Sequence, residues 1–197
     1  MMSVDRRSGV WKTVESMVGP DRWAHIRGVV DTARELSVRF GVDESAAELA
    51  ALLHDAAREW PVERLARYAA RGRDGPGPLE QCLPELLHGY AAAAWAEIEL
   101  GITDPQVLAA VRYHTTGRPN PTRLEMVLMV ADYSEPTRSF PEAEPIRKEA
   151  QQSLEAAYLL SLDTRLRHLI DRGLPIHPRT VEARNWLLLR RADGFRG

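Results

Sequence analysis

Residues 46–55, AAELAALLHD, form an Ala/Leu-rich segment that ends in an adjacent histidine and aspartate, His54 and Asp55. Asp43 precedes the segment as a suitable N-cap, so we predict a helix through Arg58 whose apolar face also carries His54. A buried polar side chain is costly unless it finds a partner. The fold must therefore bring partners to His54 and Asp55.

Helical periodicity continues on both sides of this segment. Pro20 begins a helix that Gly41 ends, and a further helix contains Leu124, Leu128 and Asp132. The other helices are predicted at 62–70, 84–100, 104–114, about 145–171 and 178–190. We find no alternating β-strand pattern, so the predicted fold class is all-α, a single helical bundle. We expect an N-terminal tail at 1–18, one domain at 19–192 and a C-terminal tail at 193–197.

The composition argues against two classes of binding partner, nucleic acids and membranes. The formal net charge of −2 gives no general attraction for nucleic acid. No stretch approaches the roughly 18 apolar residues of a membrane span, and the single Cys82 excludes an internal disulfide. We therefore expect a cytoplasmic protein with neither nucleic acid nor membrane as partner.

Four of the six histidines and two aspartates fall at inward positions of different predicted helices. The six residues are His25, His54, Asp55, His88, His114 and Asp132. A lone inward histidine is more often a hydrogen-bonded core residue, and that alternative stays open for each. A metal site would explain all six together, because imidazole and carboxylate suit iron, manganese, cobalt, nickel or zinc. With one bridging carboxylate, six ligands suffice for two metals about 3.5–4 Å apart.

Cationic and hydroxyl side chains lie close in sequence to these ligands. Arginines occur at positions 22, 58, 118 and 138, which favours an anionic substrate that bears phosphate. Thr115, Thr116 and Gly117 form a turn directly after His114 and could make an anion pocket. The alternative is that the arginines are solvated and that the turn only ends a helix.

Two stretches are more specific than the His-Asp pair: RYHTTGRP at 112–119 and VADYSEPTRSF at 130–140. With them, the chain from His25 to Asn185 resembles the HD-domain metal-dependent phosphohydrolases. More narrowly, it resembles the symmetrical bis(5'-nucleosyl)-tetraphosphatases of the YqeK type. The resemblance implies an HD-type helical domain with a two-iron centre. It also implies that a metal-bound hydroxide cleaves diadenosine tetraphosphate, a dinucleoside polyphosphate, into two ADP molecules.

The resemblance also implies a role for individual residues. One metal would be held by His25, His54, Asp55 and Asp132, and the other by His88 and His114 with Asp55 as the bridge. The catalytic residues would be Asp55, His88 and His114. The substrate-binding residues would be Arg58, Thr115, Gly117, Arg118, Glu135 and Arg138, with Glu135 orienting Arg138 or a bound water.

The chain departs from the family pattern after the His-Asp pair, where Ala56 and Arg58 stand in place of an aromatic residue and a lysine. Two alternative functions therefore stay open. One is an HD-type phosphohydrolase that acts on another nucleotide or a phosphomonoester. The other is a nucleotide- or metal-sensing module without turnover. Apolar residues at 186–189 could pack internally or form a homodimer contact.

Overall fold

The computed structural model describes residues 4–193. Within this part the chain forms eleven helices and no β-strand, which confirms the all-α prediction. The helices are α1 (Val4–Glu15), α2 (Pro20–Phe40), α3 (Glu44–Leu53), α4 (Val62–Ala69), α5 (Pro78–Cys82), α6 (Pro84–Leu100), α7 (Pro105–Tyr113), α8 (Arg123–Ser134), α9 (Ala143–Ala150), α10 (Leu154–Asp171) and α11 (Pro178–Asp193).

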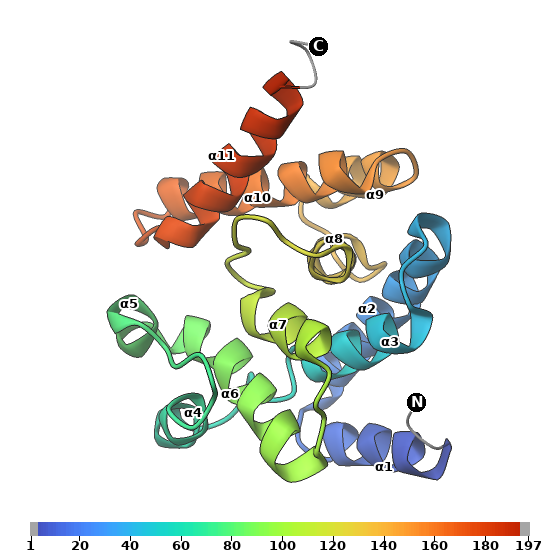
Figure 1. The fold of residues 1–197 in the computed structure, drawn as a ribbon, viewed down its shortest axis with the longest axis vertical. Coiled ribbons are helices and arrows are strands. Elements are labelled where there is room, and N and C mark those ends of the chain that lie inside the picture. The colour runs from blue at the N-terminus through green and yellow to red at the C-terminus, as the bar shows by residue number, and fades with distance from the viewer. Residues whose placement is uncertain (1–3, 194–197) are drawn as a thin grey trace.

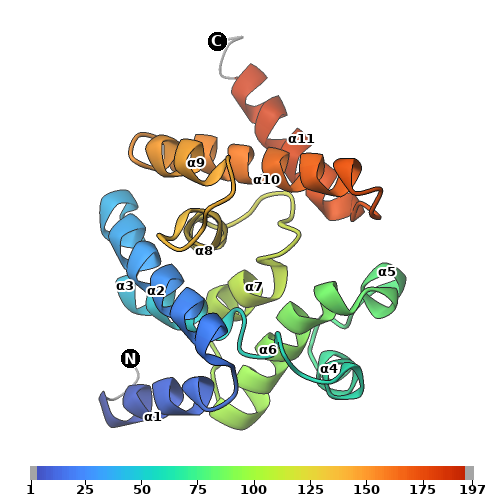
Figure 2. The ribbon, with the colours of Figure 1, turned by 180° about the vertical axis from the view of Figure 1, so that it is seen from behind.

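Helices α7 and α8 lie in the middle of the molecule in both ribbon views (Figures 1 and 2). Helix α2 packs against α3 and α8, while α6 packs against α4 and α7. Helix α10 packs against α8, α9 and α11. Helices α1 and α11 lie at opposite ends of the molecule (Figure 1). Helices α7 and α8 therefore pack against helices from both earlier and later parts of the chain.

The helix boundaries with clear capping signals agree with the sequence prediction. Pro20 occupies the first turn of α2, and Gly41 ends that helix in the left-handed region at a φ of 65°. The side chain of Asp104 caps α7. Helix α8 begins with a complete capping box between Thr122 and Glu125, a start that was not predicted.

Two predicted helix spans are wrong. Helix α3 ends at Leu53 rather than Arg58, because the backbone from His54 onward forms successive turns, among them Ala56 N to Leu53 O at 3.1 Å. The predicted helix at 145–171 is two helices, since the hydroxyl of Ser153 accepts from Ala156 N and caps α10 anew. The short helix α5 was not predicted.

The segment expected as an N-terminal tail, 1–18, contains α1. Val10 and Val14 of this helix belong to the core, and Trp11 Nε1 donates to Glu48 Oε1 at 3.0 Å. Residues 1–3 and 194–197, and with them most of the predicted C-terminal tail 193–197, lie outside the described residues.

Close approach of α6 to α7 depends on Gly89. A Cβ atom at this position would lie 2.9 Å from Arg112 O and 3.0 Å from Val111 O. Any side chain there would push the two helices apart, so glycine permits the contact. Among the described residues, no helix is both long and apolar enough to cross a membrane.

Candidate metal centre

The structure brings all six predicted metal ligands together in the centre of the bundle. His25 lies on α2, His88 on α6 and Asp132 on α8. His54 directly follows α3 and His114 directly follows α7, so both rings stand at helix ends. All six side chains are buried. Because they come from five helices, only the folded chain can assemble them.

A first group of donor atoms gathers around His25 and His54. Their Nε2 atoms are 3.4 Å apart, and Asp55 Oδ2 lies 3.7 Å from the first and 3.6 Å from the second. Asp132 Oδ1 lies 3.2 Å from His25 Nε2 and 4.0 Å from His54 Nε2. Two imidazoles and two carboxylates therefore face one point.

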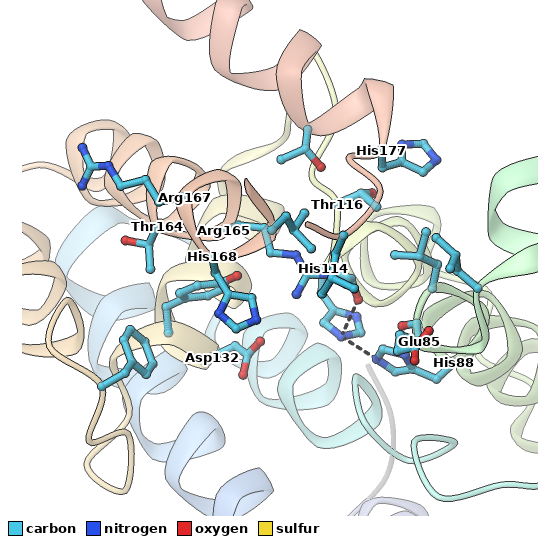
Figure 3. Close-up of a pocket in the computed structure, with 18 of the residues that line it drawn as sticks. Glu85, His88, His114, Thr116, Asp132, Thr164, Arg165, Arg167, His168 and His177 are labelled. Atoms are coloured by element: carbon cyan, nitrogen blue, oxygen red, sulfur yellow. Dashed lines mark hydrogen bonds between the residues drawn. The ribbon is translucent and has the colours of Figure 1, made fainter. Parts of the chain in front are cut away.

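A second group forms around His88 and His114, whose Nε2 atoms are 3.0 Å apart (Figure 3). Asp55 Oδ1 lies 3.2 Å from His88 Nε2 and 3.8 Å from His114 Nε2. The two oxygens of Asp55 thus face different histidine pairs. Each histidine pair together with Asp55 has the compact arrangement of a metal-binding triad.

The other ring nitrogen fixes the tautomer of three of the four histidines. The Nδ1 atoms of His54, His88 and His114 lie 2.6–2.7 Å from the backbone carbonyls of Ala51, Glu85 and Val111, to which they can only donate. The Nε2 atoms then carry lone pairs that point at one another. Such lone pairs repel unless a cation lies between them, and a donated Nδ1 proton is typical of metal-bound histidine. The donor set therefore fits two metal ions.

The electrostatics differ among the ligands. Burial would lower the pKa of His25, but the hydrogen bonds to Asp132 and Glu135 and the charge of Asp132 raise it. At three other ligands the shifts favour the protonation states that metal binding needs. Burial lowers the pKa of His54, and burial together with the charges of His88 and His54 lowers the pKa of His114 to about 3. Burial opposes ionisation of Asp55, but His54 and His88 hold the pKa of this carboxyl well below its ordinary value. Near neutral pH, His54 and His114 are neutral imidazoles and Asp55 is an ionised carboxylate.

Three arginines stand next to the ligands. Arg22 Nη1 donates to Asp55 Oδ2 at 2.6 Å, and Arg138 donates to Asp132 Oδ1. Arg58 Nη1 lies 3.3 Å from Glu85 O and 3.2 Å from the ring of His88. Arg58 and Arg138, which the sequence predicts to bind substrate, therefore lie beside the metal ligands.

Glu135 is fully buried and supports His25 rather than facing substrate. Its Oε1 accepts from His25 Nδ1 at 3.0 Å, and Thr137 N donates to its Oε2 at 2.6 Å. A Cβ atom at Gly28 would lie 2.5 Å from Glu135 Oε2, so glycine leaves room for the carboxylate. Gly28 was missed by the sequence analysis, although it follows His25 by three residues on the same helix.

A cavity of about 780 Å³ opens onto the centre. Of the predicted substrate-binding residues, Arg58, Thr115 and Arg138 line it, and Thr115 Oγ1 lies 3.2 Å from His114 Nε2.

Gly117, Arg118 and Glu135 do not line this cavity. Arg118 instead forms a two-point ion pair with Glu125, at 2.8 and 2.7 Å. Gly117 has a φ of 66°, and a Cβ atom there would lie 2.6 Å from Tyr158 Oη. In the structure these two residues shape the turn after His114.

The opposite side of the cavity comes from the C-terminal helices, which the sequence analysis did not assign to the site. Six residues of α10 line the cavity: Thr164, Arg165, Arg167, His168, Leu169 and Asp171. We call the first four the α10 wall. Figure 3 shows Arg165 and His168 projecting from α10 toward the side that holds His114 and Asp132. Their signal in the sequence was a group of polar residues within one turn of a helix that is otherwise rich in leucine.

The HD domain family model matches residues 22–137, which include all six ligands. The chain is 39% identical over 175 residues to a Bacillus subtilis protein named symmetrical bis(5'-nucleosyl)-tetraphosphatase, with 89% of this chain and 94% of that protein covered. It is also 39% identical to a Halalkalibacterium halodurans protein of the same name, with 85% and 89% covered.

A solved structure supports the same relationship. An HD superfamily hydrolase of Clostridium acetobutylicum, described as involved in NAD metabolism, matches with a TM-score of 0.89 and 36% identity. The match covers 96% of this chain and 99% of that one. The ligand geometry, the family match and these relatives agree, and the chain belongs to the HD domain family, alongside the proteins named symmetrical bis(5'-nucleosyl)-tetraphosphatase.

Proposed function

We propose that this protein hydrolyses diadenosine tetraphosphate symmetrically into two ADP molecules at a two-metal centre. The observation that carries the proposal is the pair of histidine groups that share Asp55, with their Nε2 lone pairs facing one another. The names of the relatives support the choice of substrate and of the bond that is cleaved. They favour this reading over another phosphohydrolase activity and over a sensing module.

Each histidine pair would hold one metal ion, and Asp55 would be shared between the two. When bound, two metal ions activate water at neutral pH and neutralise charge on the phosphoryl oxygens. We propose iron, while manganese, cobalt, nickel and zinc suit the same nitrogen and oxygen donors. Asp132 would join His25 and His54 on the first ion.

The chain's own side chains would bind and orient the polyphosphate. Arg58 and Arg138 line the cavity beside the ligands and can donate to phosphate oxygens. The hydroxyl of Thr115 lies 3.2 Å from His114 Nε2 and could donate to a phosphate oxygen at the centre. No side-chain nucleophile is needed. Glu135 would act as a positioning residue, because its contact with His25 holds that ring in place.

The test is chromatographic identification of products after anaerobic reconstitution with ferrous iron. We expect ADP as the sole product from diadenosine tetraphosphate and none from the metal-stripped protein. AMP together with ATP would contradict symmetric cleavage. Faster turnover of a different nucleotide or phosphomonoester would show that this compound, and not diadenosine tetraphosphate, is the substrate. Tight binding of diadenosine tetraphosphate without product would favour a sensing module.

A homodimer and a cytoplasmic location stay predictions from the sequence. In the apolar stretch at 186–189 of α11, Leu187 is buried within the chain, whereas Leu189 is exposed on the surface. Sedimentation of the full chain would measure the oligomeric state.

A further inference from the structure

The α10 wall stands across the cavity from the metal ligands and lies outside the matched family region, 22–137. It gathers cationic and hydroxyl side chains on one helix. Thr164 is buried, Arg165 is half-buried, and His168 is exposed. The mechanism proposed above uses none of them.

The two arginines of the wall form no ion pair among the described side chains, although Asp171 of the same helix and Glu142 line the same cavity. Arg22 and Arg138 are engaged by the carboxylates of Asp55 and Asp132. Among the described side chains, by contrast, no carboxylate oxygen lies within 4.0 Å of the guanidinium of Arg165 or Arg167. The partner of Arg165 is the hydroxyl of Tyr133. An anion in the cavity would therefore meet an unpaired charge here.

Thr164 supplies a second and independent indication of a ligand. The residue is 8% exposed, and its Oγ1 is buried without a hydrogen-bond partner among the described residues. A buried hydroxyl without a partner is costly, so proteins rarely leave one in place. Threonine in a helix has two accessible χ1 rotamers, and rotation to the other one would bring Oγ1 to a different staggered position. Because Thr164 lines the cavity, a bound ligand can supply the missing partner once rotation about χ1 brings the buried Oγ1 to the cavity surface.

The chemistry of symmetric cleavage calls for such a site. A four-phosphate chain that breaks in the middle leaves a diphosphate on each side, and one of them extends away from the attacked phosphorus. The cavity of about 780 Å³ is large enough for more than the reacting phosphates. We infer that the α10 wall binds the diphosphate of one ADP half, through Arg165 and Thr164 with Arg167 beside them. This inference rests on the proposed function.

The first test compares Arg165→Gln with Arg172→Gln. Arg172 is an exposed residue at the end of the same helix and does not line the cavity, so its replacement is a matched change of charge. We expect Arg165→Gln to raise KM for diadenosine tetraphosphate about tenfold or more, with a smaller effect on kcat. The control should match the wild type. Unchanged helical circular dichroism would show that both variants fold.

The second test is calorimetric titration of the iron-loaded protein with ADP, which the reaction does not consume. We expect two ADP molecules per chain for the wild type and one for Arg165→Gln over the same concentrations. Thr164→Val should weaken ADP binding while leaving the melting temperature unchanged or higher, because it removes an unpaired buried hydroxyl. A lowered melting temperature with unchanged binding would make Thr164 structural and overturn its assignment.

The two proposals fail differently. Suppose that Arg165→Gln and Thr164→Val release ADP with the wild-type KM and bind ADP as the wild type does. This result would overturn the assignment of the α10 wall as a binding site and leave the proposed function standing. Two bound ADP molecules, one of them lost in Arg165→Gln, without any cleavage of diadenosine tetraphosphate, would leave the wall standing and overturn the function. A wild type that binds fewer than two ADP molecules would overturn the wall.

Discussion

At the scale of single residues, Asp55 holds the centre together. Its two oxygens face different histidine pairs, and Arg22 donates to one of them. Its ionised form is favoured even though it is buried, since His54 and His88 lower its pKa. The sequence could identify Asp55 as a ligand from its place beside His54. The split of its two oxygens depends on the turn after α3, which helical periodicity did not predict.

Asp55→Asn should therefore remove the anionic donor that both metal sites share. We expect metal content to fall from about two ions per chain to one or fewer, and ADP release to fall at least a hundredfold. Asp31→Asn is the matched control, because Asp31 is exposed on α2 and forms its ion pair with Arg34, away from the metal ligands. Metal content by mass spectrometry and helical circular dichroism are the measurements. Two tightly held ions in Asp55→Asn would rule out the shared-ligand arrangement.

At the scale of elements, capping residues made the helices predictable where they act locally. Asp104 and Pro105 fix the start of α7, as Pro20 and Gly41 fix the limits of α2. Helix α1 could not be found in this way. Its stability depends on burial of Val10 and Val14, and on a contact with Glu48 that is distant in sequence.

The approach of α6 to α7 is tested by Gly89→Ala. The added Cβ atom would meet two carbonyl oxygens of α7, so we expect a loss of about 1–3 kcal/mol in the free energy of unfolding. The movement should also separate His88 from His114 and weaken metal binding. The control is Gly9→Ala in α1, where nothing lies within 4 Å. Helix propensity alone should make that variant more stable, by up to about 1 kcal/mol. The free energy of unfolding is measured by urea denaturation. An equal increase in both variants would show that α6 and α7 can accommodate the added methyl group.

At the scale of the whole molecule, Glu80 joins both sides of the cavity. It lies on α5 and accepts from Tyr90 of α6 at 2.8 Å, from Arg179 of α11 at 2.9 Å and from His177 at 3.0 Å. Both His177 and Thr180 line the cavity near this cluster. Such a cavity could not be predicted from the sequence, because periodicity gives the inward face of each helix but not which helices stand opposite each other.

The Glu80 cluster predicts a pH dependence of stability. Burial opposes ionisation of Glu80, but its hydrogen bonds, including that from Tyr90, and the charge of His177 lower its pKa below the ordinary 4.5. A carboxyl with a lowered folded-state pKa stabilises the fold above its unfolded-state value, and this contribution is lost as the pH falls through the folded value. We expect the wild type to be more stable than Glu80→Gln above pH 4.5, with the difference shrinking below it. Urea denaturation across this range measures it, and a difference independent of pH would contradict the assignment.

The most direct test of the account is to measure metal content and ADP release on the same iron-reconstituted samples. We predict two ions per chain, with ADP the sole product of diadenosine tetraphosphate, and loss of activity in step with removal of metal by a chelator. Undiminished ADP release after complete removal of metal would contradict the central claim, as would cleavage into AMP and ATP.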